Sequence, residues 1–124
     1  MYLWVPTQIL NFFITGGLTL RLEGAAKTAV GYSREGIYIL QPDAVNDKEH
    51  WLQLGGSGAL WYDQIFQNWK IGPKDDLGSS SSWIMSNVNN STGPLEATTW
   101  KYNSSGVWIE ATEEIILAAG IIFD

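Results

Sequence analysis

The chain has no cysteine, which excludes disulfides, thiol nucleophiles and cysteine-ligated zinc. Charge is also scarce. Charged residues make up 16% of the chain, whereas soluble domains usually carry roughly 25%. Helical bundles line their surfaces with Lys, Glu and Arg. The low charge and the 13 glycines therefore argue against a bundle and favour β structure.

Basic residues are few: seven Lys and Arg stand against 13 Asp and Glu, for a net charge of -6. Nucleic acids are bound by clustered basic side chains that displace counterions from phosphates. Anionic membrane surfaces select for the same clusters. We therefore expect no nucleic-acid partner, and a ligand that is neutral, cationic or another protein surface.

A long uninterrupted apolar run is missing as well. The first twenty residues are mostly apolar, but Pro6, Gln8 and Asn11 interrupt them, so we expect no membrane insertion. A secretory signal would begin with positive charge, and the first charged residue is Arg21.

Residues 1–17 are open to three interpretations: a strand, a linker or a degenerate signal. The strand is favoured, because residues 8–15 and 18–23 flank Gly16 and Gly17, a dipeptide typical of two-residue hairpins.

The cellular compartment is left open by two opposing signals. Asn89, Asn90 and Asn103 each begin an Asn-x-Ser/Thr glycosylation motif, which favours an extracellular setting. The absence of cysteine argues the other way for a small domain.

Short β-like runs separated by turn residues fill the chain, which predicts an all-β fold. We expect an antiparallel meander of about seven to nine short strands, as a sandwich or partly closed barrel. No apolar stripe of helical spacing exceeds two turns. The length suits one domain, assigned to residues 18–118, with 119–124 as a C-terminal strand or linker. The expected strands are 18–23, 36–40, 50–54, 59–63, 68–71, 82–86, 99–102, 107–111 and 114–118, with 121–123 as a further candidate.

Seven tryptophans dominate the composition. Side chains alternate between the two faces of a strand, so Trp69 and Trp100, opposite lysines, are expected in the core. Trp51, Trp61 and Trp108 share a face with Gln, Asp and Glu respectively, and are expected at the surface.

A sugar ring has an apolar C–H face and a rim of hydroxyls, which suits an indole flanked by amides and carboxylates. The predicted ligand-binding residues are therefore Trp51, Trp61, Asp63, Asn68 and Trp108.

Catalytic signals are weak. The single histidine, His50, has no nearby partner typical of a hydrolase or a metal site, and no G-x-S-x-G motif is present. The candidates for a glycosidase-like acid/base pair are Glu96, Glu110, Glu113 and Glu114, and those for a calcium ligand are Asp75 and Asp76. Both are weaker than a surface-turn interpretation. We expect a non-enzyme without a cofactor.

Several short motifs recur in a familiar order between residues 31 and 117. They are Gly36–Leu40, His50-Trp51, Leu60–Asp63, Trp69–Gly72, Leu77–Ser79, Trp83–Ser86, Pro94 and Trp100–Tyr102. In this order they resemble the small Gly/Trp-rich β modules, often in tandem, of large proteins of marine invertebrates, protists and oomycetes. The preceding segment 20–24 is similar to the opening strand of those modules.

The resemblance implies an architecture and an interaction role, with no assigned activity. It implies that Gly36, Tyr38, Trp69, Gly72 and Trp100 belong to the scaffold. Ligand preference is then expected in the loops 41–50 and 87–99.

The leading hypothesis is a non-catalytic recognition module, with a glycan as the suggested ligand. The alternative is a structural module of a larger tandem-repeat protein that self-associates through its edge strands, residues 8–15 and 121–123. A barrel for a small hydrophobic ligand and a glycosidase-like enzyme rank lower.

Overall fold

A computed structural model describes residues 16–88 and 92–120. Nine strands form one antiparallel sheet in the order β8-β7-β6-β5-β4-β3-β2-β1-β9. From β1 to β8 each strand pairs with the next one in sequence, so the sheet is a meander, and β9 returns to lie beside β1. The predicted all-β meander is confirmed, and of its two forms the sheet adopts the partly closed barrel.

The elements are short. In chain order they are β1 (Leu18–Leu22), α2 (Gly24–Val30), η1 (Tyr32–Arg34), β2 (Gly36–Leu40), β3 (Trp51–Gln53), β4 (Gly58–Asp63), β5 (Asn68–Pro73), η2 (Lys74–Asp76), β6 (Ile84–Ser86), η3 (Pro94–Glu96), β7 (Trp100–Ser104), β8 (Val107–Glu110) and β9 (Ile115–Ala119).

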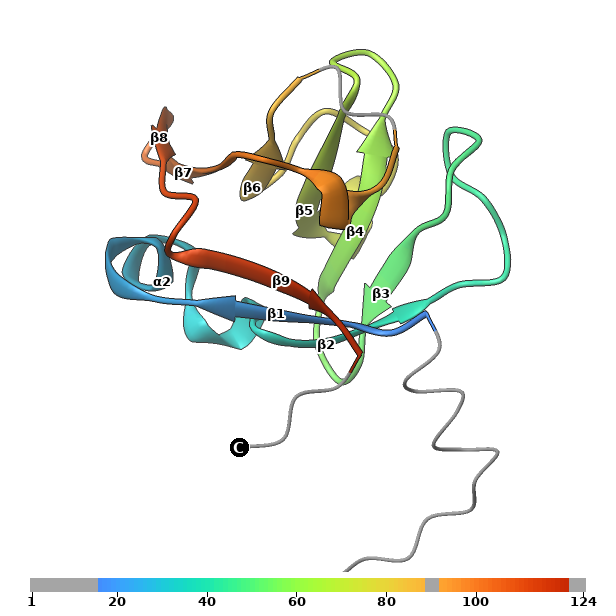
Figure 1. Cartoon of the computed structure of the whole chain (residues 1–124), viewed down its shortest axis with the longest axis horizontal. Coiled ribbons are helices and arrows are strands. Elements are labelled where there is room, and N and C mark those ends of the chain that lie inside the picture. Colours follow the sequence, from blue (N-terminus) through green and yellow to red (C-terminus); the bar gives the residue numbers. More distant parts are fainter. Residues whose placement is uncertain (1–15, 89–91, 121–124) are drawn as a thin grey trace, which may run out of the picture.

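The sheet curls into a half-barrel. Figure 1 shows β1 and β9 crossing the molecule while β4 and β5 run steeply to them, so that one face of the sheet wraps around the interior. Two helical segments lie across the open side, where α2 contacts β7 and η3 contacts β9. The 3-10 turn η3 thereby brings the 87–99 loop over the inner face.

The inner face holds the hydrophobic core. Register and alternation place one residue in two from each strand on this face, and most of these side chains are buried. The core comprises Leu18, Leu20, Leu22, Ala26, Tyr38, Trp51, Leu60, Tyr62, Trp69, Ile71, Ile84, Trp100, Tyr102 and Ile115. Tyr38, Trp69 and Trp100, expected in the scaffold, are thus buried as predicted.

The helix α2 was not among the expected elements. Its seven residues, GAAKTAV, bury only Ala26, and an isolated helix of this length is marginal in water. A distant carboxylate supports it: the Glu114 side chain accepts from the backbone N–H of Ala25 and of Ala26, both at 3.2 Å. Neither α2 nor any other helix in the described part of the chain has the length and apolarity to cross a membrane.

The sequence predicted that residues 8–15 pair with β1 as a hairpin, but β1 pairs with β2 and β9. Both edges of β1 are occupied, by β2 on one side and β9 on the other. The predicted first arm, residues 8–15, lies outside the described residues, as does the candidate strand 121–123. Alternation identified β1 correctly, but it carries no information on which strand comes to lie beside it.

Gly24 is required by the contact between α2 and Glu114. Its φ is +56°, and a Cβ at this position would overlap the Glu114 carboxylate. We expect Gly24→Ala to lower the free energy of unfolding by roughly 2–3 kcal/mol, from left-handed strain plus loss of the cap. Chemical denaturation measures it.

Gly55→Ala is the matched control, because Gly55 also has a positive φ, +70°, but no atom near its missing Cβ. Gly55→Ala should lower the free energy of unfolding only by the left-handed backbone strain, about 1–2 kcal/mol. In a Glu114→Ala background the two glycine substitutions should cost the same. A persisting difference there would show that Glu114 is not the cause.

Candidate functional site

A cavity of about 200 Å³ lies at one end of the half-barrel. Its walls come from the two loops in which ligand preference was expected, the 41–50 loop and the described part of the 87–99 loop. Its floor comes from the inner face of the sheet. The lining residues are Leu18, Lys48, Glu49, Trp51, Trp69, Thr92, Gly93, Pro94, Leu95 and Glu96.

The floor of the cavity is aromatic. Trp69 packs edge-to-face against Trp51, with ring centroids 6.0 Å apart, and against Tyr62 at 5.3 Å. The Trp51 Nε1–H donates to the Gly16 carbonyl oxygen at 2.6 Å. The Trp69 Nε1 atom is buried and has no hydrogen-bond partner among the described residues. The floor of the cavity is therefore apolar and aromatic, formed where Trp51 and Trp69 meet.

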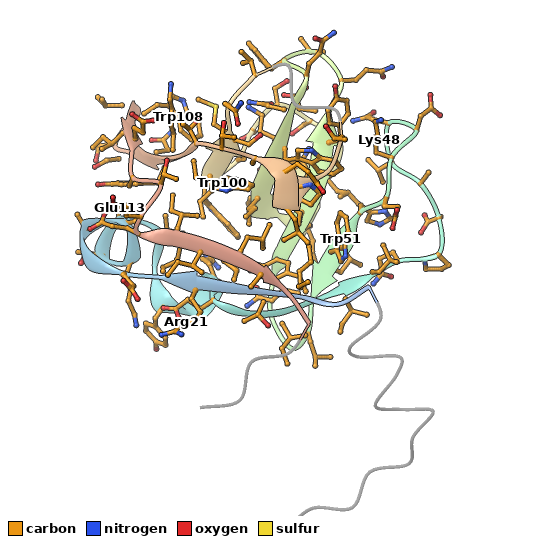
Figure 2. The ribbon with its side chains drawn as sticks, in the orientation of Figure 1. Arg21, Lys48, Trp51, Trp100, Trp108 and Glu113 are labelled. Atoms are coloured by element: carbon orange, nitrogen blue, oxygen red, sulfur yellow. The ribbon has the colours of Figure 1, made fainter. Side chains whose placement is uncertain are left out.

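The rim of the cavity is charged, with Lys48 and Glu49 on one side and Glu96 on the other. The Lys48 ammonium lies 5.6 Å from the centre of the Tyr62 ring, so it is drawn toward the aromatic floor. Figure 2 shows Lys48 and Trp51 at the same end of the molecule. The rim supplies acceptors from two carboxylates and donors from one ammonium.

Each loop is fastened to the domain by one asparagine. Asn46 Nδ2 donates to the carbonyl oxygens of Tyr62, at 2.8 Å, and Gly78, at 3.1 Å. Asn87 Oδ1 accepts from the backbone N–H of Thr98 and Thr99. These bonds fix the loop bases beside the cavity, because side-chain amides take the place of backbone partners in irregular segments.

Trp51, one of the predicted binding residues, lines the cavity, but the expectation that it is exposed is wrong. Its side chain is 7% exposed and lies on the inner face. Gln53, which suggested a wet face, is buried beside it. The Gln53 amide donates to the carbonyl oxygens of Ser33 and Glu35 and accepts from the Gly58 N–H, so backbone groups satisfy it without water.

Trp61, Asp63 and Asn68 were also expected at the surface, and the structure encloses all three, with exposures of 0%, 1% and 0%. They lie on the outer face of β4 and β5, as alternation predicted. The Trp61 Nε1–H donates to the Ser79 carbonyl oxygen at 2.8 Å, so the segment after η2 covers this ring. The outer face is therefore a second buried layer in this region.

Trp108 is half-buried, whereas its two neighbours in β8 are exposed. Val107 and Ile109 point to the opposite face from Trp108 and are 63% and 38% exposed. They lie on the same face as Tyr102, but β8 is the last strand of the sheet and extends past the core. Figure 2 shows Trp108 far from Trp51. The predicted ligand-binding residues therefore do not converge on one surface.

A buried ion pair, missed from the sequence, occupies the outer face next to Trp108. Lys70, 3% exposed, places its Nζ 3.6 Å from Asp63 Oδ2 and 3.5 Å from the Met85 sulfur. The rings of Phe66 and Trp108 lie 5.1 and 5.9 Å from the same nitrogen. Burial lowers the pKa of Lys70 below its usual 10.5, and Asp63 opposes that shift.

Of the four glutamates considered for catalysis, Glu96 lies on the rim of the cavity and the other three lie elsewhere. Glu110, Glu113 and Glu114 border a shallow hollow between β8 and β9, where Figure 2 labels Glu113. The Glu114 carboxylate caps α2. Asp75 and Asp76 form the turn η2, and within residues 16–88 and 92–120 no three His, Asp or Glu residues gather as metal ligands would.

Comparison with protein-family models, with curated proteins and with solved structures finds no match to this chain. The resemblance to Gly/Trp-rich modules stays a prediction, and the function is argued from the cavity.

Lys70→Met is expected to lower the free energy of unfolding by about 3–5 kcal/mol, because it leaves the Asp63 carboxylate buried without a counter-charge. Adding Asp63→Asn should restore most of the loss. In the wild type, Asp63 Oδ1 accepts from the backbone N–H of Ile65 at 2.9 Å and of Phe66 at 3.3 Å. The asparagine side chain keeps an oxygen that can accept both hydrogen bonds. Urea denaturation of the two variants measures the difference.

The pH dependence provides an independent readout of the same pair. Because the folded state lowers the pKa of Lys70, the unfolded chain binds more protons just below pH 10.5. The Lys70 contribution therefore makes the protein more stable as pH rises toward that value. The double variant should lack this rise relative to the wild type. Parallel pH profiles would contradict the assignment.

Proposed function

We propose that this domain is a non-catalytic recognition module that binds a carbohydrate in the cavity between the 41–50 and 87–99 loops. The observation that carries the proposal is the cavity floor, where Trp51 and Trp69 meet below a rim of Lys48, Glu49 and Glu96. Ligand pockets are typically apolar and aromatic with a few placed polar groups, and this cavity has that composition.

A carbohydrate fits better than the other ligands considered. A purely hydrophobic molecule would use the floor but offer no polar group to the rim charges of Lys48, Glu49 and Glu96. A sugar ring offers a C–H face to an indole and hydroxyl groups that both donate and accept, so it matches the floor and the rim together.

We also propose that the cavity binds its ligand without catalysing a reaction. Glu114, one of the four sequence candidates for an acid or base, accepts from the N–H groups of Ala25 and Ala26 in α2, away from the cavity. The two rim carboxylates are exposed, whereas a catalytic acid is usually tuned by burial. Release of reducing ends from any bound glycan would contradict this part of the proposal.

Filling the cavity should abolish binding. Thr92 and Thr98 are both exposed, but only Thr92 lines the cavity. We expect Thr92→Met to reduce glycan binding at least about tenfold, equivalent to about 1.4 kcal/mol, and Thr98→Met to leave it unchanged. A neutral-glycan array followed by titration calorimetry on the hits measures both. Equal losses in the two variants, or an array without signal, would count against the cavity as a glycan site.

The second candidate function is protein interaction through a sheet edge, and β8 favours it. Among the described strands its only neighbour is β7, and it exposes Val107 and Ile109. Unpaired edges with apolar side chains are sites of strand addition. If the domain self-associates, Val107→Lys with Ile109→Lys should convert it to a monomer in sedimentation velocity. A wild-type protein that is monomeric at every concentration removes this candidate.

A further inference from the structure

The turn between β7 and β8 carries a glycosylation motif that the proposed function does not use. Asn103 begins the acceptor sequence Asn103-Ser104-Ser105. Ser105 and Gly106, at the tip of the turn, are exposed, and Figure 1 shows the β7–β8 hairpin at the periphery of the molecule. The neighbouring core residue Tyr102 lies on the opposite face of β7. A bulky group attached to Asn103 therefore extends into solvent without displacing the core.

The side-chain amide of Asn103 uses only its oxygen within the described part of the chain. Oδ1 accepts from the backbone N–H of Gly106 at 2.8 Å, which closes the turn. Nδ2, the atom to which an N-linked sugar is attached, has no hydrogen-bond partner among the described residues and is not sealed from solvent. A glycosylated asparagine keeps its Oδ1, so the contact with Gly106 is compatible with the modification.

Trp108 is the direct cross-strand neighbour of Asn103. The register pairs the two residues, and side chains of directly opposite residues leave the same face of the sheet with Cβ atoms about 4.5–5.5 Å apart. Trp108 is half-buried, so part of its side chain is open to solvent. Its ring lies 5.9 Å from Lys70 Nζ in β5, and β7 lies between β8 and β5 in the sheet. The ring therefore leans toward the strand that carries Asn103.

We infer that Asn103 is an N-glycosylation site and that the first N-acetylglucosamine of its attached glycan packs against the Trp108 ring. The apolar C–H face of a pyranose suits an indole, and attachment to the neighbouring residue holds the two rings close together. In the transfer, Nδ2 forms a bond to C1 of the sugar and gives up one proton. The bond from C1 to the diphosphate of a lipid-linked oligosaccharide breaks, and the lipid diphosphate leaves. Neither the cavity nor its ligand enters this assignment.

Two neighbouring serines provide matched variants for the modification. Ser105 supplies the hydroxyl that the motif requires, whereas Ser104 occupies the variable position. The full chain is expressed behind a cleavable secretion signal in animal cells. The secreted and the cell-retained chains are trimmed to the first N-acetylglucosamine by an endoglycosidase, digested and analysed by mass spectrometry.

We expect Asn103 to carry the sugar in the wild type and in Ser104→Ala, and to be unmodified in Ser105→Ala. An unmodified Asn103 in the wild-type chain overturns the assignment, whether or not Asn89 and Asn90 are modified. A sugar that persists on Asn103 in Ser105→Ala also overturns it, because the attachment would then not use the motif.

The contact with Trp108 has its own readout in the trimmed protein. An indole face shifts nearby C–H proton resonances upfield through its ring current, so we expect upfield-shifted sugar protons with nuclear Overhauser contacts to Trp108. Trp108→Leu should return these resonances to the positions of the same sugar on a flexible peptide. Phe66→Leu is the control, because the Phe66 ring also lies beside Lys70, 5.1 Å from its Nζ, but comes from the β4–β5 turn. It should leave the sugar resonances unchanged.

The two parts of the inference are separable. A modified Asn103 whose sugar resonances match those of a flexible peptide in the folded wild type overturns the packing on Trp108 and leaves the modification site standing. If Trp108→Leu does not fold, the Overhauser contacts in the wild type decide the outcome.

Discussion

The edge-to-face packing of Trp69 against Trp51 and Tyr62 is the interaction on which the domain most depends. The three residues come from β5, β3 and β4, which are adjacent in the sheet, and all lie on its inner face. Edge-to-face pairs of this kind stabilise a core by about 0.5–1.5 kcal/mol each beyond the area that they bury. The same contact is the centre of the core and the floor of the cavity. Stability and recognition therefore draw on one set of side chains.

Alternation and turn residues were sufficient to predict the strands but not how the sheet closes. The expected strand 36–40 matches β2, and the other described strands begin or end within two or three residues of their predicted bounds. The helix α2 escaped prediction because its support comes from Glu114, far along the chain, rather than from its own seven residues. The pairing of β1 with β9 was not predicted either, because it also joins segments that are far apart in the sequence. A period-two pattern shows which face each residue occupies but not which strand lies beside it.

The sequence predicted the loops of the candidate site but not which of its tryptophans are buried. The 41–50 and 87–99 loops were expected to carry ligand preference, and they wall the cavity. Trp61, Trp69 and Trp100 were placed on the right faces, whereas Trp51 lies on the inner face and not on the outer one, and the burial of Trp61 was misjudged. A polar neighbour was taken as a sign of solvent, yet backbone groups hydrogen-bond Gln53, and Asp63 accepts from the following turn and lies 3.6 Å from the Lys70 ammonium. Such satisfaction depends on segments distant in sequence, so alternation cannot reveal it.

The two asparagine anchors have a consequence for how this surface can change over time. Asn46 and Asn87 hold the loop bases through backbone carbonyl and N–H groups, which every residue type provides. Apart from the buried Pro94, the loop residues beside the cavity contribute little to the core, since Thr92, Leu95 and Glu96 are exposed. Positions 48, 49, 92, 95 and 96 can therefore be randomised in a display library while the framework stays intact, which makes the domain a cysteine-free scaffold for selecting new binders.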